Sequence, residues 1–255
     1  MSRGYKQTMS QISRDVYLFI YEAGIKLEAR ATTVATASVL CHRFYRSFEK
    51  LQEQQQCASI SNADQYCPFT LAATCLYLAG KVEEDFLKIR DVTNVCYRIL
   101  HKDDADELEV GETYWDVRES IGRFEHLLLR QLAFRVHVDH PHRYLMHYLD
   151  ALHNWLPTDV WHSAPIATVA VAVLRDSYTC PKVIERHQPA TIALACINIA
   201  MDTFNVKVPL ADADSRYPWW RLFDDSCHAA KLHSVTNELI REVYERDDAS
   251  STGAR

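Results

Sequence analysis

Glycine is scarce in this chain, which has six glycines among 255 residues, at positions 4, 24, 80, 111, 122 and 253. Neither Asn-Gly nor Asp-Gly, the dipeptides typical of β-hairpin turns, occurs. The phosphate loops G-x-x-x-x-G-K-[ST] and G-x-G-x-x-G are absent, as are the catalytic patterns H-E-x-x-H and G-x-S-x-G. We therefore expect no enzymatic activity in the chain itself, no cofactor and no small-molecule substrate.

A surplus of positive charge is missing as well. The chain has 28 basic and 34 acidic residues, a formal net charge of −6, and the two signs are interspersed. No basic stripe could follow a phosphate backbone, so we expect no direct contact with nucleic acid. No apolar run approaches the roughly 18 residues of a membrane span. The N-terminal segment MSRGYKQTMSQ lacks the apolar core of a signal peptide, so neither a membrane segment nor a secretory leader is expected.

Disulfide and metal-binding patterns are lacking too, although the chain contains eight cysteines. None forms C-x-x-C, and several lie inside apolar helical runs such as TLAATCLYLA and TIALACINIA. This is typical of reduced, packed cysteines in an intracellular protein of the nucleus or cytoplasm. Histidines cluster around His140, His142, His147 and His153, but no pair stands four residues apart with a third ligand in view. We expect no metal site.

Hydrophobic residues make up 48% of the chain, and they recur every three or four positions. This spacing indicates an all-helical protein with a sizeable core. Thr32 or Thr33 is expected to cap the second helix, and Trp219 or Trp220 to be largely buried. The expected helices are Ser10–Leu27, Thr32–Phe48, Pro68–Glu84, Ile89–His101, Glu112–Phe134, Pro141–Trp155, Asp159–Tyr178, Pro189–Phe204, a short one in PWWRLFDD, and Ala229–Arg246.

An internal repeat divides the chain into two halves. PFTLAATCLYLA at 68–79 aligns with PATIALACINIA at 189–200, and VATASV at 34–39 with IATVAV at 166–171. Alanine-rich, apolar helices of this kind are typically surrounded by other helices. The sequence predicts two five-helix units, each around a central apolar helix. Their expected bounds are 10–136 and 137–246, with a mobile loop at 49–65 and flexible tails at 1–9 and 247–255.

The third helix carries one seam that could face outward. Thr70, Thr74, Tyr77 and Lys81 follow each other at steps of four, three and four residues, and the rest of the helix is apolar. Lys81 ends this seam, where its charge also suits the negative end of the helix dipole. The acidic residues of LYLAGKVEED follow directly. The pattern is compatible with a solvated helix end or with a surface that binds something.

The fifth helix places a carboxylate among aliphatic residues. On a helical wheel Glu125 lies next to Ile121, Leu129 and Leu132. An unpaired charge in such surroundings costs several kcal/mol, so Glu125 needs a partner, and Lys81 is a candidate. The pair could be an internal salt bridge that joins two helices. It could equally be a paired acid and base, on an apolar patch, that receives the backbone of another protein.

These two motifs carry a resemblance to a known family. LAGKVEE, followed about forty residues later by RFEHLLLRQLAF, resembles the cyclin box, and the likeness extends over residues 10–246. It implies a tandem cyclin fold and a heterodimer with a cyclin-dependent kinase, bound through unit 10–136. In cyclins the matching lysine and glutamate engage the kinase backbone just before its αC helix. By motif these are Lys81 and Glu125, with added apolar contacts from Val82, Leu129, Phe134 and Val136.

Further segments are similar to one group within that family. FIYEAGIKLEAR, HPHRYLMHYL and PWWRLFDD look like the cyclin-Q group, whose members partner cyclin-dependent kinase 10. The transcription-type cyclins K, L and T are the nearest alternative. The first helix departs from the pattern that forms the substrate-docking patch of mitotic cyclins. Two other classes remain open, a helical adaptor similar to transcription factor IIB and a helical hydrolase; the net charge opposes the first, and no acid–base cluster supports the second.

Overall fold

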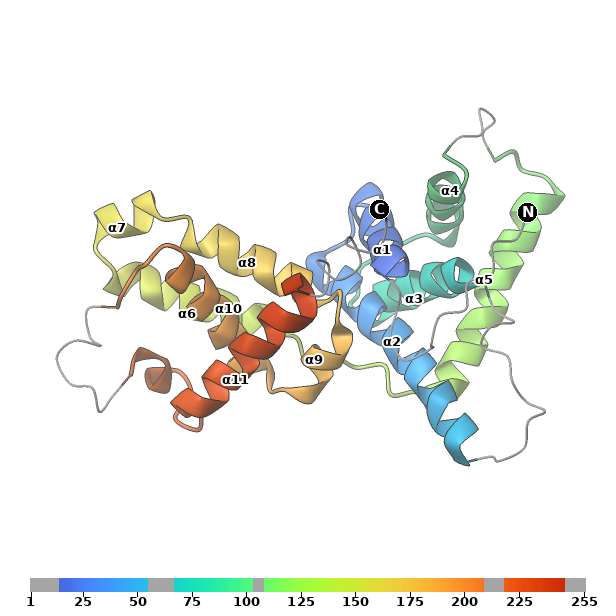
Figure 1. The fold of residues 1–255 in the computed structure, drawn as a ribbon. Helices are drawn as coiled ribbons and strands as arrows, with labels where there is room; N and C mark the ends of the chain where they lie inside the picture. The colour runs from blue at the N-terminus through green and yellow to red at the C-terminus, as the bar shows by residue number, and fades with distance from the viewer. Residues whose placement is uncertain (1–13, 55–66, 103–107, 209–217, 246–255) are drawn as a thin grey trace, which may run out of the picture. The chain divides into compact units, whose positions relative to one another are not determined.

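The structure is a computed structural model in which the chain divides into two compact units, Met1–Val138 and Asp139–Arg255 (Figure 1). From the sequence, this boundary was expected between residues 136 and 137. The described residues contain only helices, turns and irregular segments, without a β-strand, so the all-helical prediction is confirmed for them. They are 14–54, 67–102, 108–208 and 218–245.

Several predictions concern segments outside these ranges. They include both tails (1–9 and 247–255), the start of the first predicted helix (10–13) and most of the predicted loop 49–65. Within the described ranges, no helix is both long and apolar enough to cross a membrane.

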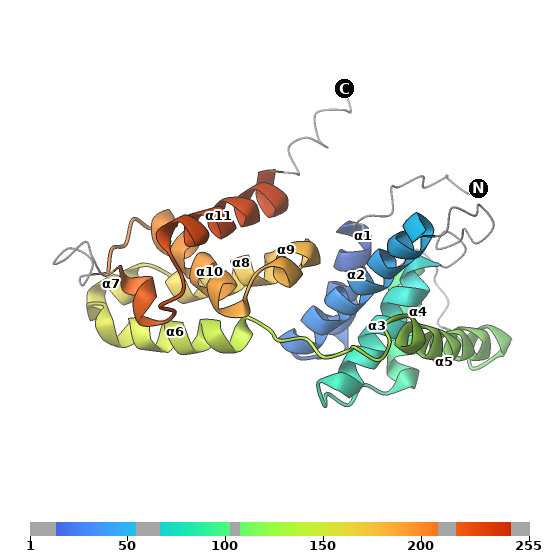
Figure 2. The same cartoon turned by 90° about the horizontal axis from the view of Figure 1, so that it is seen from below.

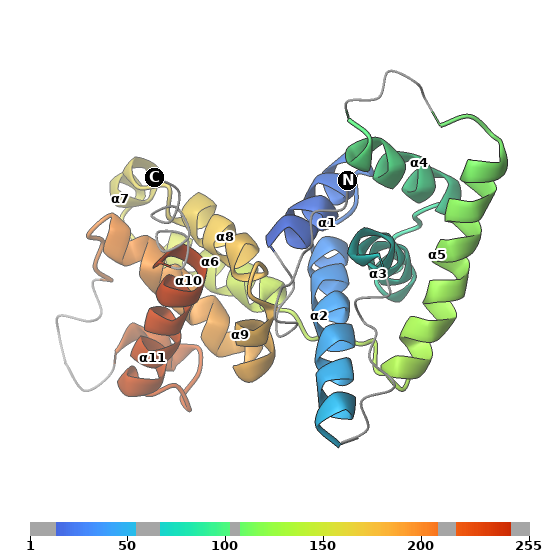
Figure 3. The same cartoon turned by 45° about the vertical axis from the view of Figure 1, so that its right-hand side comes forward.

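The described part of the first unit is built around helix α3, which packs against the other four helices (Figure 3). Most α3 side chains are buried. The buried residues include three alanines and a glycine, which are Ala72, Ala73, Ala79 and Gly80. Small side chains let the neighbouring helices approach α3 closely. The helices of this unit are α1 (Arg14–Lys26), α2 (Ala31–Gln54), α3 (Pro68–Val82), α4 (Ile89–Leu100) and α5 (Glu112–Gln131).

The second unit repeats this plan around α10, which packs against α6, α8 and α11. Figure 2 shows α10 between α6 and α11. Two short helices, α7 and α9, supplement the longer ones. The elements in the described part of this unit are α6 (His142–Trp155), α7 (Thr158–Ser163), α8 (Ile166–Ser177), α9 (Pro181–Arg186), α10 (Pro189–Thr203), a 3-10 helix (Trp219–Leu222) and α11 (Ala229–Leu239), which continues as a π-helix (Ile240–Glu245).

The two central helices begin and end in the same way. Each has 15 residues and starts with a proline in its first turn, Pro68 in α3 and Pro189 in α10. Each is followed by a residue in left-handed backbone, Glu84 at φ 53° and Asn205 at φ 56°. The next N–H then donates to a carbonyl five residues back, which is the Schellman closure of a helix. The sequence repeat therefore extends through the ends of the helices.

Some predicted helix ends differ from the structure. The predicted helix Asp159–Tyr178 is divided, because Ala164 is extended (φ −113°, ψ 119°) before Pro165. Proline disfavours helical backbone in the residue before it and has no N–H to donate. Helix α2 continues beyond Phe48 to Gln54, through residues that favour helix. Helix α5 ends at Gln131 instead of Phe134, because Ala133 and Phe134 take left-handed backbone.

The tryptophan pair near the end of the chain closes the core of the second unit, as predicted. Trp219 is buried, and its ring lies edge-on to Phe223 with centroids 6.1 Å apart. Phe223 also stacks on Trp155 at 5.2 Å. These rings join the 3-10 helix to α6.

Candidate functional site

Lys81 and Glu125 meet between α3 and α5. Lys81 Nζ lies 2.6 Å from Glu125 Oε1. The Lys81 side chain is 49% exposed, whereas the Glu125 side chain is 13% exposed. The structure thus brings together the two residues that the motifs singled out. The ammonium group stays accessible, and the carboxylate lies at the edge of the core.

The surroundings of Lys81 keep it protonated. Burial lowers the pKa of Lys81, but the hydrogen bond and the charge of Glu125 outweigh this effect, and the net shift is upward. The ammonium also lies 4.3 Å from the centre of the Tyr77 ring, within the range of a cation–π interaction. The Lys81 side chain is therefore positively charged over the whole physiological pH range.

The ion pair does not use all of its hydrogen-bonding capacity. An ammonium group has three donors and an ionised carboxylate has two acceptor oxygens. Within the described residues, Lys81 donates to Glu125 Oε1 and also interacts with the Tyr77 side chain, which leaves at least one donor, and no side-chain bond to Glu125 Oε2 is present. The pair can therefore donate to a carbonyl and accept from an N–H of another chain at the same time.

The outward seam predicted along α3 is interrupted at Thr74. Thr74 is fully buried, and its hydroxyl donates to the carbonyl of Thr70 at 2.8 Å. A threonine that satisfies its hydroxyl on its own helix can lie in an apolar core. Thr70 and Tyr77 are half-buried and Lys81 is exposed, so the seam reaches the surface on both sides of Thr74.

The four apolar residues that the family resemblance suggested are only partly accessible. Val82, Leu129 and Val136 are half-buried. Phe134 is 67% exposed, and its backbone N–H donates to Leu129 O at 2.9 Å. This hydrogen bond fixes the backbone of Phe134 at the end of α5, so its ring presents an exposed apolar surface beside the helix.

The segment after α5 is also held from α2. The Arg43 guanidinium donates to the carbonyls of Arg135 at 3.2 Å and His137 at 3.1 Å. These bonds fix the backbone on both sides of Val136. Arg43 could not be predicted as part of this segment, because nothing in the local sequence pattern indicates a contact more than ninety residues away.

The acidic residues after Lys81 have a structural role that the sequence analysis did not identify. The Asp85 carboxylate accepts from the Arg30 N–H at 2.8 Å and from the Thr33 hydroxyl at 2.7 Å. Glu83 accepts from the Thr36 hydroxyl at 2.7 Å. Both carboxylates bind the first turns of α2, where the helix dipole favours negative charge. The predicted cap by Thr32 or Thr33 is wrong, because Thr33 lies inside α2 and Asp85 satisfies the free N–H instead.

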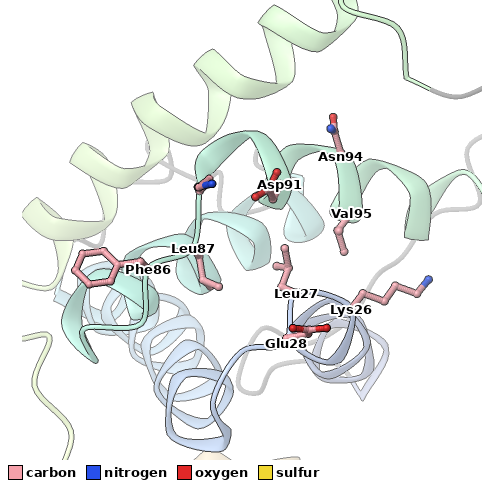
Figure 4. A pocket seen from close by; sticks show the side chains of 9 residues that line it. Lys26, Leu27, Glu28, Phe86, Leu87, Asp91, Asn94 and Val95 are labelled. Atoms are coloured by element: carbon pink, nitrogen blue, oxygen red, sulfur yellow. The ribbon is translucent and has the colours of Figure 1, made fainter.

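Phe86 is another surface residue that the sequence analysis missed. It follows Asp85 and is 97% exposed. Figure 4 shows Phe86 pointing away from a pocket of about 360 Å³ between α1, α4 and the α3–α4 loop. The lining of this pocket combines the apolar side chains of Leu27, Leu87 and Val95 with charged side chains of both signs. No pattern of spacing marks Phe86 as exposed, since apolar residues are usually buried.

The described residues contain no metal site that could compete with the surface around Lys81 and Glu125. Within the described ranges, no group of three or more His, Cys, Asp or Glu residues could hold a metal ion. The strongest candidate for function in this part of the chain is therefore the surface around Lys81 and Glu125.

The comparison with protein families identifies the class. The sequence pattern described as "Cyclin, N-terminal domain" matches residues 3–137, more than half of the 255-residue chain. The chain therefore belongs to the cyclin family. This match favours the cyclin interpretation over the adaptor and the hydrolase, and the expected cyclin fold is confirmed.

Similar proteins include cyclins T and L. Cyclin-T1-3 of Oryza sativa subsp. japonica is 29% identical over 241 residues, which cover 93% of this chain and 44% of the relative. Cyclin-L2 of Mus musculus is 30% identical over 227 residues, covering 88% and 37%. The chain thus spans less than half the length of these relatives.

Two solved structures share the fold. A chain of the yeast RNA polymerase II CTD kinase CTDK-1 complex has a TM-score of 0.65 at 15% identity, covering 89% of this chain and 64% of that one. A chain of the Chaetomium thermophilum CAK complex bound to ATP-gamma-S has a TM-score of 0.58 at 19% identity, covering 94% and 65%. At these identities the likeness concerns the fold alone.

Proposed function

We propose that this chain is the non-catalytic, activating subunit of a cyclin-dependent protein kinase. The single observation that carries the proposal is the Lys81–Glu125 pair, whose ammonium is exposed and which keeps an unused donor and an unused acceptor oxygen. Exposed Phe134 and half-buried Val82, Leu129 and Val136 would add apolar contacts. Membership of the cyclin family makes a kinase the partner that fits this surface.

The proposed mechanism is a shift in the conformation of the kinase. A kinase needs its αC glutamate paired with its β3 lysine before the ATP phosphates are aligned. The chain would dock on the kinase N-lobe and bind only the state in which αC is turned inward. Shifting a population from 1:99 to 99:1 takes roughly 5.5 kcal/mol of differential affinity. An interface on the order of 2,000 Å² can supply this.

For the kinase we propose cyclin-dependent kinase 10, because the segments quoted above resemble the cyclin-Q group. A transcriptional kinase is the alternative, supported by similarity to cyclins T and L and by the kinase named in the CTDK-1 complex. Either assignment makes a nuclear location the first one to examine, with the cytoplasm as the second. We propose no direct binding to nucleic acid, membranes or small molecules.

Affinity capture followed by a kinase assay tests the function. The tagged chain is expressed in cells of the source organism, and bound kinases are identified by mass spectrometry. We expect a cyclin-dependent kinase to be captured, and its purified catalytic subunit to phosphorylate a substrate peptide only when this chain is added. Capture without activation, or no kinase at all, would contradict the proposal.

A charge exchange separates docking from an internal salt bridge. Lys81→Glu or Glu125→Lys is expected to abolish kinase binding, because loss of one charged contact in an interface costs about 2–5 kcal/mol. The double variant Lys81→Glu/Glu125→Lys restores an ion pair between α3 and α5 with its polarity reversed. We expect the double variant to melt near the wild-type temperature and still fail to bind kinase in calorimetry.

The opposite result would favour the internal role. If the double variant bound kinase again, the pair would serve only to join α3 to α5. The stability effects of the single variants are expected to be small, because partly exposed ion pairs contribute about 0–1 kcal/mol.

A further inference from the structure

Three glycines lie inside helices of the described residues, and close contacts with other described residues require two of them to be glycine. A Cβ on Gly24 in α1 would overlap the Val34 side chain of α2. A Cβ on Gly80 in α3 would lie 2.8 Å from the Asp85 carbonyl oxygen. A Cβ on Gly122 in α5 would meet nothing within 4 Å among the described residues.

Gly122 therefore weakens α5, and no contact with the described residues compensates for this. Glycine destabilises a helix relative to alanine, because it loses more backbone freedom on folding. Gly122 does not need a left-handed backbone either, since no glycine in the described residues has positive φ. Alanine at this position would fit the chain and strengthen the helix.

The position of Gly122 connects it with the Lys81–Glu125 pair. Gly122 stands three residues before Glu125, so the two are neighbours on the surface of α5. Gln131 faces α2, where its amide donates to the Ser47 hydroxyl at 2.9 Å. Gly122 and Gln131 are nine residues apart, which at about 3.6 residues per turn puts them on opposite sides of the helix. Gly122 thus lies on the side of α5 turned away from α2.

The same side of α5 carries groups that suit a polypeptide. Arg118 lies one turn before Gly122, with its guanidinium 5.2 Å from the centre of the Trp115 ring. Trp115 is 51% exposed. Glu125 and half-buried Leu129 follow Gly122 along the helix. Along this side of α5, the cation of Arg118 is followed by the open position at Gly122, the carboxylate of Glu125 and the apolar side chain of Leu129.

We infer that Gly122 is the point at which the backbone of the kinase lies directly against α5. This inference rests on the proposed function and makes it more specific. The kinase segment passes over the open position, so that its N–H reaches Glu125 and its carbonyl reaches Lys81. An acidic or carbonyl group of the same segment binds Arg118. A side chain at position 122 would hold that segment away from both charges.

Substitution of Gly122 tests the inference, with recombinant cyclin-dependent kinase 10 and the kinase subunits of CTDK-1 and CAK as probes. We expect Gly122→Ala to raise the melting temperature and to weaken kinase binding about tenfold, as overpacking of a tight contact does. Gly122→Leu is expected to weaken binding a hundredfold or more. Arg123→Leu is the matched control, because it places the same side chain on the exposed neighbouring residue and should leave affinity unchanged.

Three results would overturn the inference, and they are distinguishable. If both Gly122 variants bound like wild type while Glu125→Lys did not, the docking function would stand and the role of Gly122 would fall. If Gly122→Ala lowered the melting temperature, the glycine would have an internal reason. If wild type bound none of the three kinases, the proposed function would fall together with the inference.

Discussion

At the scale of single residues, the charged side chains at the end of α3 and directly after it have different roles. Lys81 joins α3 to α5, while Glu83 and Asp85 bind the first turns of α2. Glu84, between them, is exposed and takes the left-handed backbone that closes α3. Sign and spacing are the same for the three carboxylates, so their partners depend on where the backbone turns.

Among the described glycines, Gly80 is expected to be the least replaceable. In Gly80→Ala the new Cβ would lie 2.8 Å from the Asp85 carbonyl oxygen and 3.0 Å from Leu87 Cγ, and a backbone atom cannot move aside easily. We expect the free energy of unfolding to fall by about 1–3 kcal/mol, the usual range for overpacking. Urea denaturation followed by circular dichroism measures this. Gly122→Ala, expected to gain roughly 0.5–1 kcal/mol, is the control, and equal effects in the two variants would contradict the argument.

His142 is expected to make the second unit sensitive to acid. Burial lowers the pKa of His142 to about 4, and its ring stacks on Tyr178 with centroids 5.6 Å apart. The unfolded chain has the ordinary histidine pKa of about 6.5. The neutral ring therefore stabilises the fold fully above about pH 6.5, and this contribution is lost as the pH falls towards 4, at up to about 1.4 kcal/mol per pH unit.

The variant His142→Phe tests this pH dependence. Phenylalanine keeps the stacking on Tyr178 but cannot be protonated. The difference in unfolding free energy between wild type and variant should change between pH 6.5 and 4 and stay constant above pH 7. A constant difference over the whole range would show that His142 does not titrate in this way. His140, which shares a 2.7 Å hydrogen bond with the Tyr178 hydroxyl, is unchanged in the variant.

At the scale of helices, α2 depends on a residue from another element. Its first turn leaves backbone N–H groups without partners inside the helix, and Asp85 from the α3–α4 loop binds one of them. The contact joins the start of α2 to the end of α3. Loop geometry and helix stability are therefore linked in the first unit.

Removal of this contact should weaken the first unit. We expect Asp85→Ala to lower the free energy of unfolding by about 0.5–2 kcal/mol, as loss of a helix cap does. Chemical denaturation measures the change. Glu84→Ala is the matched control, because Glu84 is the exposed neighbour and surface changes usually stay within about 0.5 kcal/mol. Equal losses in the two variants would contradict a specific role for Asp85.

At the scale of the whole molecule, each unit has its own central helix and its own core. Helix α3 is surrounded by α1, α2, α4 and α5, and α10 by α6, α8 and α11. A helix that buries most of its surface within one unit needs no cover from the other. The two units also share the proline start and the Schellman end of this helix.

The first unit is therefore expected to fold by itself. Residues 1–138, produced alone, should have a helical circular dichroism spectrum and melt cooperatively. The fragment should also bind the kinase, since it contains Lys81, Gly122 and Glu125. The fragment 139–255 serves as the control and should fold without binding kinase. A first unit that aggregates or melts without cooperativity would show that its core is incomplete.

Much of the architecture follows from local pattern. Apolar residues at three and four positions, few glycines and a repeated alanine-rich helix indicate an all-helical chain with two central helices, and this was confirmed. The break at Pro165 was missed because the apolar period continues across it, although the proline itself was the available signal. The end of α5 was missed because non-glycine residues, Ala133 and Phe134, occupy left-handed backbone.

Some residues of the candidate site could likewise be predicted from the sequence, and others could not. Motif and helical wheel were enough to select Lys81 and Glu125, because side-chain direction follows from position within each helix. The roles of Asp85 and Arg43, the burial of Thr74 and the open side of Gly122 required coordinates. Each of these depends on which helix packs against which, and spacing within one helix carries no information about contacts from a segment fifty or ninety residues away.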